Sequence, residues 1–292
     1  MAWNIRSIVL TGAAVLAAAA FAQQYPPQPQ PYPAQQYPQQ GYPGPVMPPQ
    51  QLDPLVQRIA LYPDPLLAQV MTASTFYNQI PDAAAWANQH NYLQGPALAQ
   101  AIAADQLPWD PSVLALLPFP SVLNMMASDP GWTQALGNAV LTEGPAVMDA
   151  IQRQRQIAWN YGYLRSNNYD RVIVEPGAIQ ILPLSPGLLY VPAYDPYVVF
   201  ARPARGFAVG AAIRFGPGIT IGAAFAPFGW VSAGLGWHAH SIVIDGQPWA
   251  RTWVNRQQYV HPYAHPFRPQ GPRVERHDLH DRGRGRGPRI NA

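Results

Sequence analysis

The chain has 292 residues, 35 of them proline, and a formal net charge of +3; every basic charge is an arginine and cysteine is absent. The absence of cysteine excludes disulfides, thiolate nucleophiles and zinc sites built on cysteine. The absence of lysine excludes a Walker-type phosphate loop and Schiff-base chemistry. A Gly-x-Ser-x-Gly elbow and a His-Glu-x-x-His helix are also missing. The composition therefore points to no cofactor and argues against an enzyme without excluding one.

Residues 1–22 have the pattern of a secretory signal peptide. The first six residues carry Arg6 and no acid, an apolar run follows over 8–20, and the run ends in the small-x-small site Ala20-Phe21-Ala22. The run is shorter than the roughly 20 apolar residues that a membrane span needs. We therefore expect a mature chain that begins at Gln23, works in the periplasm or outside the cell, and has no transmembrane span. An uncleaved N-terminal anchor is the alternative.

Residues 23–50 consist almost entirely of Gln, Pro, Tyr and Gly, with Tyr-Pro pairs starting at positions 25, 32, 37 and 42. Proline fixes φ and lacks the N–H that a helix or sheet needs, so we expect a disordered tether with polyproline-II character. Two uses stay open. The tether is a spacer for the folded part, or its Tyr-Pro pairs dock in an aromatic groove or associate with each other.

Residues 51–165 carry the start signals of several short helices. At four positions an aspartate directly precedes a proline, the order expected for an N-cap and the first helical residue. These aspartates are Asp53, Asp64, Asp110 and Asp129, and Gly95-Pro96 and Gly144-Pro145 repeat the pattern with a weaker cap. Apolar residues follow at three- and four-residue spacing, as in Leu66, Leu67 and Val70. The pattern predicts a helical domain folded as an orthogonal bundle of six or seven short helices.

Residues 166–258 change to β-branched and aromatic runs divided by Pro and Gly, which predicts a small antiparallel β region and an α+β fold. The turn signal at 184–187 predicts a hairpin between 178–182 and 188–191. A Gly/Ala/Trp-rich stretch follows, and Asp245-Gly246 predicts a second hairpin turn. We expect the protease-resistant core to cover 52–200.

Residues 259–292 form a His-, Arg- and Gly-rich segment for which we expect no fixed structure. Residues 51–200 carry a net charge of −6, whereas residues 201–292 carry +8. We expect the basic tail to bind an anionic envelope polymer or lipid head groups, since export removes intracellular nucleic acid as a partner. Alternatively, the tail only keeps the chain soluble, or it folds back on the acidic half. The arginines expected to bind the polyanion are Arg268, Arg273, Arg276, Arg282, Arg284, Arg286 and Arg289.

Two acids are candidates for acid–base chemistry on a glycan. Asp64 and Asp195 both stand among Tyr and Pro residues, and a folded chain can bring two such carboxylates together. The structural alternative is that Asp64 caps a helix and Asp195 shapes an Asx-type turn, and this is the interpretation we favour.

Four histidines are weak candidates for metal ligands. His238 and His240 would share one face if 237–243 is a strand, and His261 and His265 follow in the sequence. Because the last two lie in or near the expected tail, we predict no metal site. Four tryptophans are equally ambiguous: they form a sugar-stacking platform or fill the core of the β region, which we prefer. These are Trp230, Trp237, Trp249 and Trp253.

Two runs resemble a bacterial exported family that is catalogued as a domain of unknown function. The run LDPLVQRIALYPDPLLAQV at 52–70 resembles the opening of that family, and LYVPAYDP at 189–196 resembles its second hallmark. The resemblance implies an envelope protein with a helical domain and a tail rich in Gly, Trp, His and Arg. It implies no activity and no catalytic residue.

Three functions stay open from the sequence. The leading hypothesis is a non-enzymatic envelope binding or scaffold protein with an adhesive basic tail. The alternatives are a hydrolase or transferase acting on cell-wall polymers and a periplasmic metal-binding protein. The sequence indicates no oligomeric state.

Overall fold

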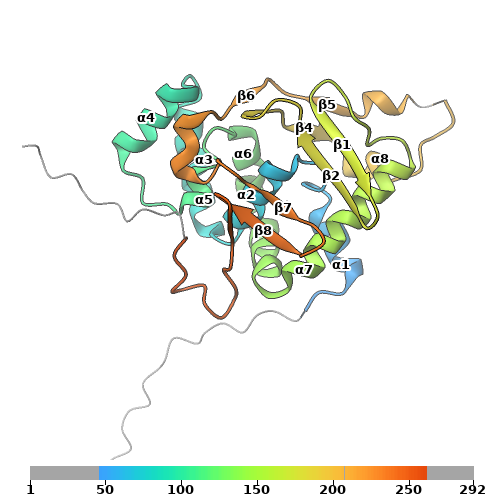
Figure 1. Cartoon of the computed structure of the whole chain (residues 1–292), viewed down its shortest axis with the longest axis horizontal. Helices are drawn as coiled ribbons and strands as arrows, with labels where there is room; N and C mark the ends of the chain where they lie inside the picture. Colours follow the sequence, from blue (N-terminus) through green and yellow to red (C-terminus); the bar gives the residue numbers. More distant parts are fainter. Residues whose placement is uncertain (1–45, 207, 262–292) are drawn as a thin grey trace, which may run out of the picture. The chain divides into compact units, whose positions relative to one another are not determined.

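Helices make up the first half of the folded chain and short antiparallel strands the second (Figure 1). The computed structural model describes residues 46–206 and 208–261. The expected signal peptide, most of the expected tether, and the tail after His261 with its seven arginines and His265 lie outside the described residues. The α+β fold class predicted from the sequence is confirmed.

The helical half places seven α-helices and one 3-10 turn before the first strand of the described chain. They are α1 (Pro49–Val56), α2 (Asp64–Ser74), η1 (Tyr77–Gln79), α3 (Ile80–Gln89), α4 (Gly95–Asp105), α5 (Pro111–Leu114), α6 (Pro120–Ser128) and α7 (Pro130–Asn160). Within the part of the chain that the structure describes, none of the helices is both long and apolar enough to cross a membrane.

The cap predictions hold at two of the four aspartates. Asp110 accepts a hydrogen bond from the N–H of Ser112 at 2.9 Å, and Asp129 accepts one from the N–H of Trp132 at 3.0 Å. The prediction is wrong at the other two, because Asp53 lies inside α1 and the side chain of Asp64 makes no cap at the start of α2. Helix α1 already has a proline at its first position, and Asp64 has stronger partners elsewhere in the fold.

Helix α7 is broken where the sequence predicts a helix start. Glu143 has φ −145° and ψ 39°, which is not helical, and Gly144-Pro145 follows directly. Proline lacks the N–H of a helix interior, so the chain kinks there and continues as a second helical segment.

In the described residues, the second half contains four small antiparallel sheets and three short helical segments. The sheets pair β1 (Asp170–Glu175) with β2 (Ala178–Pro183), β3 (Leu188–Leu189) with β6 (Ile219–Thr220), β4 (Pro192–Tyr194) with β5 (Ile213–Phe215), and β7 (Gly234–Gly236) with β8 (Ser241–Ile244) and β9 (Gln247–Pro248). The helical segments are α8 (Pro196–Val199), η2 (Val209–Ala211) and η3 (Ala223–Phe228).

One hairpin prediction is confirmed and one is wrong. Asp245 and Gly246 have φ of +52° and +70°, and they turn the chain between β8 and β9. The chain also turns at 184–187, but β2 pairs with β1 and β3 pairs with β6. Only residues 176 and 177 separate β1 from β2, so these two strands pair with each other. The strands that flank 184–187 therefore belong to different sheets.

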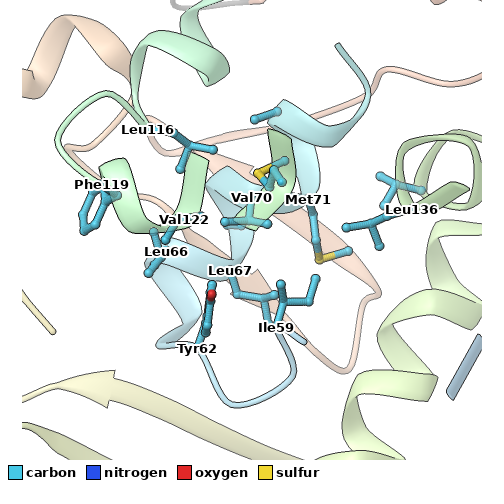
Figure 2. Packing of buried hydrophobic residues seen from close by; sticks show 14 of the residues in the cluster. Ile59, Tyr62, Leu66, Leu67, Val70, Met71, Leu116, Phe119, Val122 and Leu136 are labelled. Carbon is cyan, nitrogen blue, oxygen red and sulfur yellow. The ribbon is translucent and has the colours of Figure 1, made fainter. Parts of the chain in front are cut away.

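Both halves contribute to one hydrophobic core. Helix α2 lies at its centre, and Figure 2 shows Leu66, Leu67, Val70 and Met71 among its packed residues. Strand β7 packs against α2, and β8, drawn beside it in orange in Figure 1, contacts the same helix. Four residues from the β region after residue 220 belong to this cluster: Phe225, Trp237, Ile242 and Ile244. The core therefore continues well beyond residue 200, where the sequence led us to expect its end.

Candidate functional site

A cavity of about 610 Å³ opens between the helical half and the β region. Five stretches far apart in the sequence line it: 58–62, 87–98, 117–125, 191–196 and 216–220. They come from the α1–α2 connection, the α3–α4 and α5–α6 connections, β4, and the β5–β6 connection. Its volume is in the range of ordinary small-molecule sites.

The two runs that carry the family resemblance meet at this cavity. The first run supplies Arg58 and Tyr62, and the second supplies Val191 to Tyr194 and Pro196. The hydroxyl of Tyr194 donates to the carbonyl of Gln57 at 2.8 Å and accepts from the N–H of Leu61 at 3.3 Å. Burial raises the pKa of Tyr194 well above its ordinary value, so the hydroxyl keeps the proton that it donates. Tyr194 thus fixes the second run against the first.

Tyr62 offers the cavity a free donor. Its side chain is only 5% exposed and lines the cavity. Among the described residues, its hydroxyl has no hydrogen-bond partner. Burial raises the pKa of Tyr62 above its ordinary value, so the group stays protonated and can donate to an acceptor brought in by a ligand.

Arg58 is a second donor at the cavity, whereas His90 directs its Nδ1 to the carbonyl of Trp86 at 2.9 Å. Arg58 Nη2 lies 2.9 Å from Asp129 Oδ2, and the guanidinium lies over the Trp132 ring, 5.1 Å from its centroid. His90 stacks on Trp86 at a centroid distance of 3.9 Å. Among the described residues that line the cavity, none is Asp or Glu. The lining itself therefore offers donors and no carboxylate, while Asp129 pairs with Arg58 and Asp105 lies 4.0 Å from His90.

Asp64 belongs to a buried network behind the cavity wall. Its Oδ1 accepts from Arg155 Nη1 at 2.7 Å and from the N–H of Ile181 at 3.3 Å, and its Oδ2 accepts from Trp237 Nε1 at 2.8 Å. Arg155 also donates to the carbonyl of Tyr62 at 2.9 Å. Burial raises the pKa of Asp64, while the guanidinium charge and these three hydrogen bonds oppose the rise.

Asp64 and Asp195 do not form a catalytic pair. Asp64 is buried and bonded to Arg155 and Trp237, whereas Asp195 is exposed and accepts from the N–H of Tyr197 at 2.9 Å, capping α8. The turn interpretation of Asp195 is therefore confirmed. The cap interpretation of Asp64 is wrong, because both of its carboxylate oxygens accept from Arg155, Ile181 and Trp237 and neither caps α2.

The candidate histidines lie apart, each with its own neighbour. Residues 237–240 form the turn between β7 and β8 rather than a strand, and His240 has φ +47°. His238 Nε2 lies 3.2 Å from the Pro176 carbonyl, and His240 Nε2 lies 2.8 Å from Asp149 Oδ1. His261 is buried, with Nε2 2.8 Å from Asp110 Oδ1. No group of three metal-binding side chains occurs in residues 46–206 and 208–261, and His265 is outside that part.

The candidate tryptophans do not share one surface. Trp237 is buried in the core, and Trp230 donates to the Ala115 carbonyl at 3.0 Å. Trp249 lies edge-on to Tyr259, and the guanidinium of Arg256 covers Trp253 at 3.8 Å. Trp237 belongs to the hydrophobic core and Trp230 and Trp249 pack against it, so the core interpretation holds for these three.

The family model described as "Protein of unknown function (DUF3300)" matches residues 48–268, more than half of the chain. The chain belongs to this family. The uncharacterized protein YacH of Escherichia coli (strain K12) is 36% identical over 184 residues, which cover 52% of this chain and 30% of YacH. The chain thus spans less than a third of the length of that relative. No solved structure matches the chain.

All the residues that line the cavity lie within the range of the DUF3300 match, whereas six of the seven tail arginines lie beyond it. Sequence reasoning missed the cavity and Arg155. Arg155 stands in the polar run Arg153-Gln154-Arg155-Gln156, which is typical of a solvent-exposed helix face, so no local signal marks it as buried.

Proposed function

We propose that this chain is an exported cell-envelope binding protein, and not an enzyme. In this proposal the folded part holds a ligand with an apolar body in the cavity. The basic end contacts an anionic envelope polymer or lipid head groups. The observation that carries the first part is the cavity of about 610 Å³ at which the two resembling runs meet.

Export is supported by the signal pattern of residues 1–22. The binding role is supported by the mostly apolar lining of the cavity, in which a few donors are placed to orient a ligand. No specific observation favours the hydrolase alternative, since the two candidate acids lie in different settings. The metal-binding alternative lacks a group of ligands in the described part of the chain.

A substitution that reduces the space in the cavity tests whether the cavity binds a ligand. Ala193 is an exposed strand residue that lines the cavity, so Ala193→Trp adds a large ring at the cavity wall without opening the core. Val174→Trp is the matched control, because Val174 is also an exposed strand residue and does not line the cavity. We expect an environment-sensitive naphthalene sulfonate dye to bind the full mature chain and the control, and to bind Ala193→Trp at least tenfold more weakly.

Equal dye binding by the two variants, or no binding by the unmodified chain, would contradict the cavity part of the proposal. Thermal melting of both variants excludes unfolding as the cause of a loss.

The basic end is tested separately with heparin as the polyanion. Residues 201–292 carry a net +8, and attraction between exposed charges is screened over about 8 Å at physiological ionic strength. Replacing the seven tail arginines by Gln should remove most of the binding and its salt dependence, whereas replacing them by Lys should keep both. If the Gln variant binds heparin as tightly as the unmodified chain and melts at a lower temperature, the tail folds back on its own acidic half instead.

A further inference from the structure

The residues that line the cavity limit the chemical class of ligand that it can bind. Five lining residues are prolines, which have no N–H and cannot donate to the backbone of an incoming peptide strand. They are Pro118, Pro120, Pro192, Pro196 and Pro217. Between them stand large apolar side chains, Leu98, Leu117, Met125, Val191 and Ile219. Such walls suit a ligand body that requires few hydrogen bonds, which favours a hydrocarbon chain over a peptide or a sugar.

Two donors that suit an anionic head stand together on one wall, while the amides of Asn91 and Gln94 and the hydroxyls of Ser121 and Thr220 line the cavity elsewhere. Arg58 and Tyr62 come from the same connection between α1 and α2. Arg58 uses Nη2 for Asp129, and a guanidinium has five N–H donors, so it keeps donors for a second acceptor. The Tyr62 side chain is 5% exposed and lines the cavity, and its hydroxyl has no hydrogen-bond partner among the described residues, so it can donate to a ligand there.

We infer that the cavity binds a single-chain anionic amphiphile, with its hydrocarbon chain along the proline-rich walls and its carboxylate or phosphate head at Arg58 and Tyr62. This inference rests on the proposed function and names the class of its ligand. The absence of Asp and Glu from the lining favours an anionic head over a cationic one. The same head-group chemistry is offered by a free fatty acid and by a lysophospholipid, which the test below separates.

The first measurement is calorimetric titration of the full mature chain with straight-chain carboxylates of eight, ten and twelve carbons. Each added methylene buried in the cavity should lower Kd about fourfold. Alkyl trimethylammonium ions of the same lengths should bind at least tenfold more weakly, because their heads cannot accept a hydrogen bond. A lysophosphatidylglycerol of matching chain length then shows whether the larger phosphate head is also accepted. Ala193→Trp should abolish binding of all of them, which separates the cavity from the basic end.

The second measurement uses Tyr62→Phe, with Tyr92→Phe as its control. Tyr92 is 74% exposed and does not line the cavity. Because the Tyr62 hydroxyl has no partner among the described residues, its removal should leave the melting temperature unchanged or raise it. Carboxylate binding should weaken about tenfold, as for loss of a hydrogen bond to a charged group. Trimethylammonium binding should not change, and Tyr92→Phe should behave as the unmodified chain.

Equal affinity for the two head groups, no dependence on chain length, or full carboxylate affinity in Tyr62→Phe would each overturn the inference. These outcomes are distinguishable from failure of the proposed function. If the dye still binds and Ala193→Trp blocks it, the cavity is a binding site whose ligand class is different. If the dye does not bind either, the binding role of the cavity itself is wrong.

Discussion

Arg155 is the largest of the fully buried side chains in the described residues, and its guanidinium is held from several sides. It donates to the carbonyl of Ala60 at 2.8 Å, to Asp64 at 2.7 Å and to the carbonyl of Ile179 at 2.7 Å, and it lies 4.7 Å from the centre of the Trp237 ring. A buried charge is tolerated only when it is paired and hydrogen-bonded. Asp64 is the counter-charge, so the pair joins α2, α7 and the β region.

Asp64→Asn should lower the free energy of unfolding by about 3 to 5 kcal/mol, because it leaves Arg155 buried without a counter-charge. Asp53→Asn is the control. Asp53 pairs with Arg153 at 2.6 Å, but both side chains are partly exposed, so its loss should cost about 1 kcal/mol or less. Urea denaturation of both variants measures the difference. Similar costs for the two would mean that the buried network is no stronger than the surface pair.

Asp170 is a buried carboxyl whose Oδ1 has no hydrogen-bond partner among the described residues. Burial raises its pKa from an ordinary 3.8 to about 7. The folded state therefore holds the proton more tightly than the unfolded state, and stability is highest below the unfolded pKa. As the pH rises from about 4, the unfolded chain loses the proton first, so stability falls until the folded pKa near 7 is passed.

Asp170→Asn should remove this pH dependence. At pH 8 the variant should be more stable than the unmodified chain, by on the order of 2 to 4 kcal/mol, and near pH 4 the two should be similar. Urea denaturation at both pH values makes the comparison. A variant that is less stable than the unmodified chain at pH 8 would show that the Asp170 carboxylate has a stabilising partner in solution.

At the scale of the elements, the tightest packing at any glycine of the described residues is between α7 and α2, at Gly137. A Cβ added to Gly137 of α7 would lie 2.1 Å from the carbonyl oxygen of Ser74, the last residue of α2. The neighbour is backbone and cannot rotate away, so any side chain at position 137 must push the two helices apart. A glycine inside an otherwise helical sequence predicts only a weaker helix. Its packing role appears only when α2 is in place.

Gly137→Ala should destabilise the fold by about 3 kcal/mol or more, because the close contact cannot relax without moving a helix. Gly144→Ala is the matched control within α7. Gly144 stands at the break in α7 and a Cβ there meets no atom within 4 Å, so the change should alter the free energy of unfolding by about 1 kcal/mol or less. Thermal melting of the two variants provides the test, and an unchanged melting temperature for Gly137→Ala would contradict the packing shown here.

On the scale of the whole molecule, the late part of the chain completes the early part. Arg251 donates to Thr75 at 2.6 Å and 2.8 Å and lies over the Phe76 ring at 3.7 Å, while His261 lies 2.8 Å from Asp110. Together with Trp237 at Asp64, these contacts tie the chain beyond residue 200 to the helical half. The core therefore extends further along the chain than residue 200, where we expected it to end.

A chain ending at residue 200 should fail to unfold cooperatively, because it loses Trp237, Ile242 and Ile244 from the core and leaves one Asp64 oxygen without its donor. A chain ending at residue 261 should melt in one cooperative transition. Circular dichroism during heating compares the two. Limited proteolysis of the full chain should likewise give a resistant fragment that extends past residue 250, and a resistant fragment ending near 200 would contradict the shared core.

The sequence by itself determined those features that depend on neighbouring residues. The caps at Asp110 and Asp129, the break at Gly144-Pro145 and the turn at Asp245-Gly246 all follow from the local preferences of Asp, Pro and Gly for particular backbone angles. The change from helical spacing to β-branched runs likewise predicted the α+β class, because each pattern suits one kind of element.

Only the tertiary structure decided the partner of Asp64, the pairing of β2 and β3, and the cavity. Asp64 meets Trp237 across 173 residues of sequence, and at this distance in the chain local composition does not say which donor arrives. The local Asp-Pro pattern predicted that Asp64 caps a helix. A buried carboxylate is stabilised more by a guanidinium and an indole N–H than by one backbone N–H, and Asp64 bonds to the former. The cavity depends in the same way on five separated stretches, so it exists only when all of them have packed.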